Sequence, residues 1–376
     1  MKRRSLIISH TRFIAFFLFL ASCISFLIGK KPTFILMPLY LLIILDKNAK
    51  PIELLFGSAL GSIFTLLVNF KVISYALFPQ AAVLYNTNPD VFFWFSRGNE
   101  HAIRLLVAYP GILLSNWSRV DITGGMTIYS SSLLVLIMNF MLRILKYNEM
   151  ENWLSAVISS IVTLILSFIM NGRMIFSFFG ITLLMMCEVM YNRGRISLLM
   201  LQVSTYIAVL FTTVSSGTLT IITAYLVLIT PYRWHLTKQK KEKICFVLIN
   251  AISLYVALTI FIPYLSRMIL RNINFFGGGF IGVFNMLQHG LGKVFYTENI
   301  LLVYLLLFFG GVTIIANISF FVRNIVKKQN KDLPLLLMVN LCVYGFLFGR
   351  STGLAMLIPV IVLFLKFLNN NVSVKL

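Results

Sequence analysis

Continuous apolar runs of roughly 17 to 20 residues recur along this chain, and they constrain its fold more than any other feature. An α-helix needs about 20 apolar residues to cross the hydrocarbon core of a bilayer, and only helices and closed barrels satisfy their backbone hydrogen bonds there. These runs are continuous rather than alternating, which favours helices over barrel strands. The sequence therefore predicts an all-α, polytopic helical membrane protein.

Composition agrees with this class. The 376 residues are 59% hydrophobic, include 34 Phe and are only 11% charged, so a soluble surface could not cover the apolar part. We expect one integral membrane domain, residues 1–376, with about twelve spans. They are predicted at 12–29, 33–45, 51–70, 122–142, 153–171, 174–190, 196–214, 217–231, 244–263, 298–322, 334–348 and 352–368.

The distribution of cations predicts an orientation. The positive-inside rule counts Lys and Arg in short loops near the membrane. If Lys2, Arg3 and Arg4 are cytoplasmic, twelve crossings place most Lys-rich connections on that side, including the run 233–243. The outside keeps mostly Arg, and both termini are expected in the cytoplasm.

Several function classes are disfavoured. The net charge of +21 is spread over thin loops that would face anionic lipid, so nucleic acid is not an expected partner. The 4 Cys show no CxxC spacing and predict free thiols. The sequence has no His and carboxylate cluster with metal-ligand spacing, no Walker loop and no GxGxxG, so neither a metal nor a cofactor is expected.

Two external segments are long enough to hold more than a turn. The first is 71–121, whose aromatic and short apolar stretches predict one or two interfacial helices. The apolar stretch 72–85, interrupted by Pro79, is either re-entrant or interfacial, or belongs to that loop. The second is 263–297, in which Gly277 to Gly279 are expected to form a hinge between two amphipathic pieces.

Arg267 and Arg271 in the second loop are four residues apart, which places both on one face of a helix. Guanidinium presents a planar fork of donors suited to phosphate oxygens and stays charged, so a diphosphate site favours Arg over Lys. The alternative is that both are interfacial cations that snorkel to lipid head groups.

Two further Arg residues lie in very short external turns. Arg173 follows Asn171 and Gly172, and a turn needs Asn and Gly but not Arg. Arg350 follows Gly349 between the last two predicted spans. Charged residues at helix ends near the bilayer more often mark a cavity than the lipid face, so both are candidate binding residues.

His289, at the end of the second loop, and Glu298, at a helix start, are candidate general bases. Glu298 is equally explained as a carboxylate at a helix N-terminus. Glu188 is expected to be solvated at a cytoplasmic helix end.

A weaker constellation lies in the first loop. His101 and Arg104 are three residues apart and would share a helix face, and Arg97 lies shortly before them. They are additional candidate binding residues.

Three segments together resemble the Wzy-type polysaccharide polymerases. In the first, NGRMIFSFFGITLLM, a Gly-Arg turn opens a predicted span. In the second, SSGTLTIITAYLVLI, a turn of small polar residues opens another span. In the third, HGLGKVFYTENILLVYLLLFFGGVTII, a Gly-rich end of the external loop precedes a long apolar helix. That family often has a Ser-Arg pair in the turn that opens a central span. Arg173 fits this role, whereas the turn at Ser215 and Ser216 lacks the Arg.

The resemblance implies a GT-C-like architecture and metal-independent, inverting glycosyl transfer at the periplasmic face of a bacterial inner membrane. The donor would be a chain on undecaprenyl diphosphate, the acceptor a lipid-linked repeat unit, and the product O-antigen or a capsule-type polysaccharide. Arg173, Arg267, Arg271 and Arg350 would stabilise the diphosphate, and His289 or Glu298 would accept the hydroxyl proton. Membrane lipids and a chain-length regulator protein are the other partners considered.

Two alternatives stay open. One is a lipid-linked oligosaccharide flippase or another transporter, whose ionisable groups would lie near the membrane midplane. The other is an O-antigen ligase, which uses the same donor and also grips a diphosphate externally.

Overall fold

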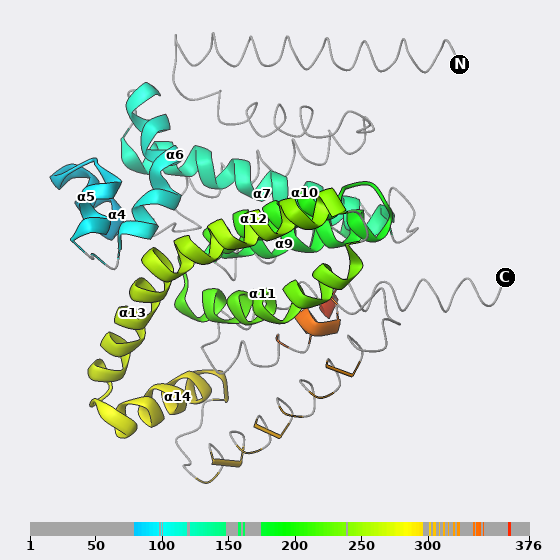
Figure 1. The fold of residues 1–376 in the computed structure, drawn as a ribbon. Helices are drawn as coiled ribbons and strands as arrows, with labels where there is room; N and C mark the ends of the chain where they lie inside the picture. Colours follow the sequence, from blue (N-terminus) through cyan, green and yellow to red (C-terminus); the bar gives the residue numbers. More distant parts are fainter. Residues whose placement is uncertain are drawn as a thin grey trace. The chain divides into compact units, whose positions relative to one another are not determined.

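The computed structural model is helical throughout its described part (Figure 1). It describes residues 79–97, 99, 101–118, 121–147, 174–237 and 240–295, with isolated positions between 157 and 161 and between 301 and 361. These residues contain helices and connecting turns and no strand. The all-α prediction is confirmed for this part. The chain divides into two compact units, one formed by 1–93 and 101–182 and the other by 94–100 and 183–376.

The first unit contains α4 (Pro79–Thr87), α6 (Ala102–Ser118), α7 (Ile122–Tyr147) and the beginnings of α5 (Val91–Ser96) and α9 (Met174–Asn192). Pro79 stands at the first position of α4, where its missing N–H costs nothing. The backbone N–H of Phe92 donates to Asp90 Oδ1 at 2.9 Å at the start of α5. The described part of 71–121 contains three helices, α4, α5 and α6, where one or two were predicted.

The helices α6 and α7 pack very closely around two glycines. A Cβ on Gly125 would lie 2.4 Å from the carbonyl oxygen of Gly111 and 2.5 Å from the backbone nitrogen of Ser115. Small residues at such positions let two helix backbones approach, as in membrane helix pairs. Consequently α6 is buried over much of its circumference, including Ile103, Leu105 and Ile112.

The second unit continues α9 into α10 (Leu198–Thr212), α11 (Ser216–Leu236) and α12 (Lys240–Val256). Ser197 caps α10 by accepting a hydrogen bond from the backbone N–H of Met200 at 3.2 Å. The small-polar turn predicted before 217 is found at 213–215, immediately before α11.

Five predicted spans coincide with described helices: 122–142 with α7, 174–190 with α9, 196–214 with α10, 217–231 with α11, and 244–263 with α12 and its continuation. Among the described residues, two helical stretches are long and apolar enough to cross a membrane, Met174–Asn192 and Lys240–Ile260. The other predicted spans lie largely or wholly outside the described residues.

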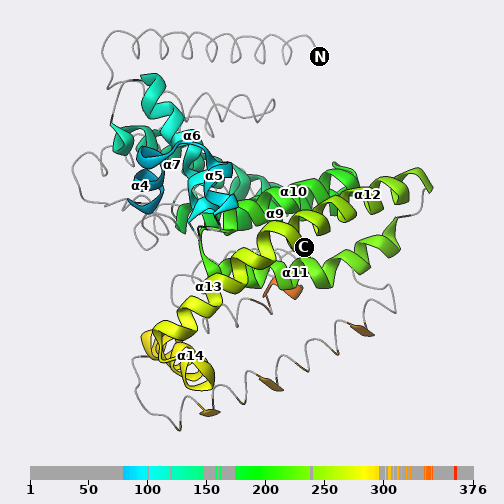
Figure 2. The ribbon, with the colours of Figure 1, turned by 60° about the vertical axis from the view of Figure 1, so that its left-hand side comes forward.

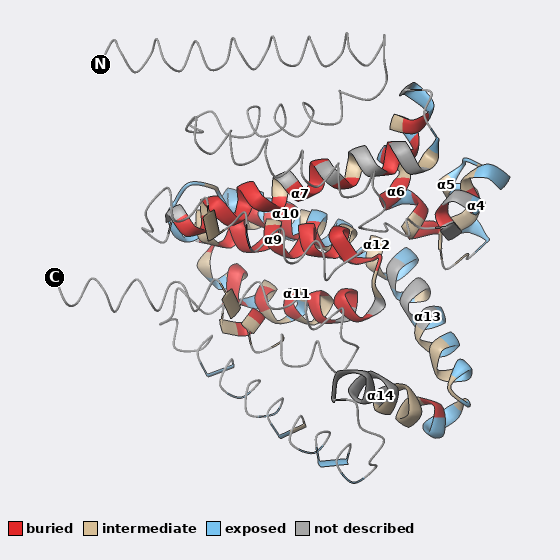
Figure 3. Ribbon diagram, turned by 180° about the vertical axis from the view of Figure 1, so that it is seen from behind, coloured by how far each residue is buried: buried red, intermediate tan, exposed pale blue. Residues whose placement is uncertain are grey.

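These two stretches differ in their surroundings. In Met174–Asn192, 78% of the apolar window is buried, as in the core of a bundle, whereas in Lys240–Ile260 only 6% is buried. The second helix therefore presents most of its apolar surface outward. Figure 3 shows α9 mostly in the buried colour, in contrast to the exposed and intermediate colours along α13.

Beyond α12 the chain stays helical through a π-helical turn, η1 (Ala257–Phe261), into α13 (Ile262–Phe275). It then turns at Gly277 to Gly279 into α14 (Gly279–Phe295), and all three glycines have positive φ (Figures 1 and 2). L-residues rarely adopt such φ values, so glycine suits this turn. The prediction of two pieces joined by a glycine hinge is confirmed.

Candidate functional site

Arg267 and Arg271 lie on one face of α13, one turn apart, and both are exposed. Ser266, Leu270 and Asn274 continue this exposed strip along the helix. The predicted common face is therefore confirmed. Two guanidinium groups one helical turn apart can contact neighbouring phosphate oxygens.

All charged residues of the helical hairpin formed by α13 and α14 are cations. Residues 262–295 contain Arg267, Arg271 and Lys293, and neither Asp nor Glu. No carboxylate from this hairpin can compete for the two guanidinium groups. The surface of α13 is thus suited to an anionic ligand.

His289 belongs to the second helix of the hairpin, its side chain lies outside the described part of the structure, and its assigned role stays a prediction. His289 lies within α14, not in irregular chain, eleven residues beyond Gly278. Figure 1 shows α14 leaving the glycine turn at a wide angle to α13, so the two helices separate away from the turn. Their close approach is at the turn, where a Cβ on Gly282 would lie 2.2 Å from the carbonyl oxygen of Ile273.

His101 and Arg104 are brought together as predicted. Arg104 Nη1 lies 3.2 Å from His101 Nδ1 at the start of α6. A guanidinium can only donate, so Nδ1 accepts and the ring carries its proton on Nε2. Arg97 is exposed just after α5. Arg173, Glu298 and Arg350 lie outside the described residues, and their assigned roles stay predictions.

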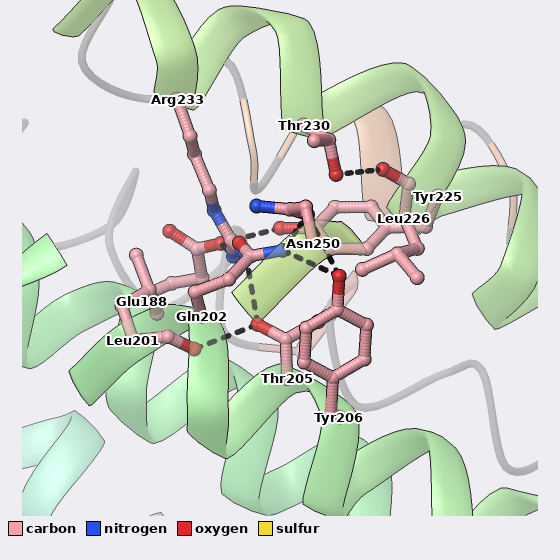
Figure 4. A network of polar contacts seen from close by, with 10 residues as sticks. All are labelled: Glu188, Leu201, Gln202, Thr205, Tyr206, Tyr225, Leu226, Thr230, Arg233 and Asn250. Carbon is pink, nitrogen blue, oxygen red and sulfur yellow. Dashed lines mark hydrogen bonds and ion pairs between the residues drawn. The ribbon is translucent and has the colours of Figure 1, made fainter. Parts of the chain in front are cut away.

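A buried polar network in the second unit was not predicted. The expectation that Glu188 is solvated is wrong, because Glu188 on α9 is only 3% exposed. Arg233, assigned above to a cytoplasmic connection, lies inside α11 and is 1% exposed. Its Nη2 donates to Glu188 Oε1 in an ion pair (Figure 4).

Neighbouring side chains complete most of the hydrogen bonding of this pair. Tyr225 on α11 donates its hydroxyl to the same Glu188 oxygen at 2.5 Å. Arg233 Nη1 donates to Gln202 Oε1 at 2.7 Å and to Thr205 Oγ1 at 2.8 Å, both on α10. A buried charge is tolerated only when it is paired and hydrogen-bonded, and this cluster largely meets that condition.

The network continues from α10 to α12. Gln202 Nε2 donates to Asn250 Oδ1 at 3.0 Å, and the Tyr206 hydroxyl donates to the same oxygen at 2.7 Å. Asn250 Nδ2 in turn donates to the backbone oxygen of Phe246 at 2.7 Å. Side chains from α9, α10, α11 and α12 are thereby linked (Figure 4).

Two polar atoms of the ion pair make no hydrogen bond within the described part of the chain, Glu188 Oε2 and Arg233 Nε. A buried polar atom without a hydrogen bond lowers the stability of the folded state, even when its neighbours are hydrogen-bonded. The sequence does hold a signal for the cluster, because Glu188, Gln202 and Asn250 interrupt apolar segments. Polar residues within apolar helices usually face other helices.

The described residues contain no group of three or more His, Cys, Asp or Glu side chains that could hold a metal ion. Comparison of the chain with protein-family models, curated proteins and solved structures finds no match.

Proposed function

We propose that the chain is an integral membrane glycosyltransferase that polymerises undecaprenyl-diphosphate-linked repeat units into O-antigen or a capsule-type polysaccharide. It would act at the periplasmic face of a bacterial inner membrane. The observation that carries this proposal is the placement of Arg267 and Arg271 on one exposed face of α13, directly beyond the exposed apolar stretch Lys240–Ile260. Two guanidinium groups at the end of a membrane helix are well placed to bind a diphosphate that lies at the depth of the lipid head groups.

The depth of these arginines follows from helix geometry. Arg267 is seven residues beyond Ile260, which corresponds to about 10 Å along a helix with a rise of ~1.5 Å per residue. The head-group region on each side of the hydrocarbon core is about 5 to 8 Å thick. Any bend at η1 brings α13 closer to the membrane plane. Arg267 therefore falls just beyond the phosphates of a bilayer that contains α12, and Arg271, about 6 Å further along the helix, reaches them only through such a bend.

The side of the membrane follows from the other end of this helix. Lys240, Lys241 and Lys243 stand at the start of α12, and the positive-inside rule assigns such an end to the cytoplasm. One crossing then places α13 on the opposite face. A lipid diphosphate that carries a sugar chain is presented on that face in this class of reaction.

The proposed chemistry needs little beyond electrostatic stabilisation. The acceptor hydroxyl attacks the anomeric carbon, the bond from that carbon to the diphosphate oxygen breaks, and the diphosphate leaves with the electron pair. Arg267 and Arg271 stabilise the charge that develops there, with Arg173 and Arg350 as further proposed contributors. His289 or Glu298 accepts the hydroxyl proton, and the anomeric configuration inverts.

A transporter of lipid-linked oligosaccharides is the second candidate, because the chain buries an ion pair among its helices, although that pair lies near the ends of α9 and α11 and not at their middles. Glu188 and Arg233 are ionisable groups enclosed by helices that coincide with predicted spans. Ionisable residues within a membrane bundle often mark a transport pathway. The same pair can instead simply hold α9, α10 and α11 together.

A deletion strain separates these candidates. Loss of a polymerase leaves single repeat units outside the inner membrane and lipopolysaccharide capped with one unit. Loss of a flippase leaves the repeat units inside, and loss of a ligase leaves uncapped core.

The role of α13 is tested in membranes supplied with lipid-linked repeat units. Arg267→Ala should reduce polymerisation strongly at unchanged protein level. Arg195→Ala, on the exposed turn between α9 and α10, is the matched control and should retain activity. Normal polymerisation by the Arg267→Ala and Arg271→Ala variants would remove the assigned roles.

A further inference from the structure

Three bulky apolar side chains are held out at the tip of the hairpin formed by α13 and α14. Phe275 is 82% exposed, Phe280 is 95% exposed and Ile281 is 70% exposed. They flank the Gly277 to Gly279 turn on both sides. Exposure of this degree at three neighbouring apolar residues is unusual for a surface in water and marks an interaction surface.

The local structure keeps these side chains outward. The backbone N–H of Gly278 donates to the carbonyl oxygen of Ile273 at 2.9 Å, which closes the end of α13. Asn285 Nδ2 donates to the carbonyl oxygen of Phe276 at 3.0 Å and ties α14 to the turn. The backbones meet at Gly282 and Ile273, which leaves no room to bury a large side chain between them there. The tip is therefore a fixed apolar feature.

The charge of the hairpin indicates what covers the tip. Arg267 and Arg271 are exposed on α13, and residues 262–295 contain no acidic side chain that would be repelled by anionic head groups. The hairpin also continues a surface that is already apolar and exposed, since Leu254, Leu258 and Ile262 are each more than half exposed just before it. Apolar residues beside cations are the pattern of elements that lie in a membrane interface.

We infer that this tip inserts into the phospholipid leaflet, with Phe275, Phe280 and Ile281 among the upper acyl chains and the α13 arginines at the phosphates. The hairpin is then an interfacial anchor for α13 on a membrane rich in anionic phospholipid. This inference concerns phospholipid and does not depend on glycosyl transfer. It fixes the depth of Arg267 and Arg271 whichever activity the protein has.

The test uses the full-length chain in nanodiscs that hold one copy each, made of phosphatidylethanolamine and phosphatidylglycerol. A fluorescent amino acid replaces Phe280, and its emission is compared with that of the same reporter at Arg195. Two quenchers are applied: phospholipid brominated near the head-group end of its acyl chains, and aqueous iodide. The helical circular dichroism signal and the elution profile confirm that each labelled protein is folded.

Insertion predicts that the brominated lipid removes most of the emission at position 280 while iodide has little effect. The reporter at 195 should show the opposite order. Strong iodide quenching at 280 would mean that the tip lies in water, and protection from both quenchers would mean that protein covers it; either result overturns the inference. A reporter at Ile281 repeats the test if the Phe280 replacement fails to fold. Replacing phosphatidylglycerol by phosphatidylcholine should reduce lipid quenching if the arginines contribute.

Discussion

Glu188 on α9 and Arg233 on α11 form an ion pair in which both side chains are almost completely shielded from solvent, at 4% and 1% exposure. The two residues are 45 positions apart in the sequence. Their pairing aligns the end of one helix with the end of another. Because Gln202 and Thr205 also bind Arg233, the pair fixes α10 in the same arrangement.

Removing one partner of this pair should destabilise the protein strongly. Arg233→Met leaves a buried carboxylate without its cation, and Glu188→Leu leaves a buried guanidinium. Breaking such a pair typically costs about 3 to 5 kcal/mol. The double variant Glu188→Leu with Arg233→Met should lose much less than the sum of the single variants. Thermal unfolding of the detergent-solubilised protein measures all three.

The same three variants separate a structural role from transport. If the double variant regains stability and still supports repeat-unit processing, the pair serves packing alone. If it is folded and inactive, the ionisable groups take part in function and the transporter gains support. Additive losses in the single variants would contradict the coupling that the geometry indicates.

The outer branch of the network should matter less than the ion pair. Tyr206→Phe removes the hydroxyl that donates to Asn250 at 2.7 Å, a bond that connects α10 to the exposed helix α12. The same hydroxyl accepts a hydrogen bond from Gln202 Nε2 at 3.2 Å, and each such bond contributes about 1 kcal/mol. Thr230→Val is a suitable control, because the Thr230 hydroxyl donates to the carbonyl oxygen of Leu226 in its own helix. Unfolding midpoints should fall further for Tyr206→Phe than for Thr230→Val.

Gly125 should tolerate no larger side chain. A Cβ there meets backbone atoms of α6 at 2.4 Å and 2.5 Å, and backbone cannot move aside as a flexible side chain does. Gly125→Ala should force α6 and α7 apart and cost about 1 to 3 kcal/mol, the range for overpacked sites. Gly311→Ala, where nothing lies within 4 Å, is the control and should be neutral or slightly stabilising. Equal unfolding midpoints for the two variants would contradict this packing.

Local patterns predicted the elements that depend on neighbouring residues. The i, i+4 spacing of Arg267 and Arg271 fixes their common face in any helix, and three successive glycines fix the turn between α13 and α14. The start of α11 after the small-polar turn was equally predictable from the sequence. Each of these features is decided within a few residues, so the sequence alone sufficed.

Features that depend on packing were not predictable in the same way. Arg233 was predicted to lie in a connecting loop, but α11 continues as far as Leu236 and therefore includes it. That extension is compatible with burial only because Glu188, Gln202 and Thr205 come from two other helices.

The last prediction concerns the choice of Arg over Lys on α13. Arg267→Lys and Arg271→Lys both keep the positive charge but lose the planar fork of donors. If α13 grips a diphosphate in the transition state, each replacement should lower the polymerisation rate substantially, up to the ~10²-fold typical of losing one preorganised donor. Lys293→Arg, on the same hairpin and with charge retained, should leave the rate unchanged. A head-group anchor needs only charge, so full activity in both Lys variants would show that the arginines bind phospholipid and not the leaving group.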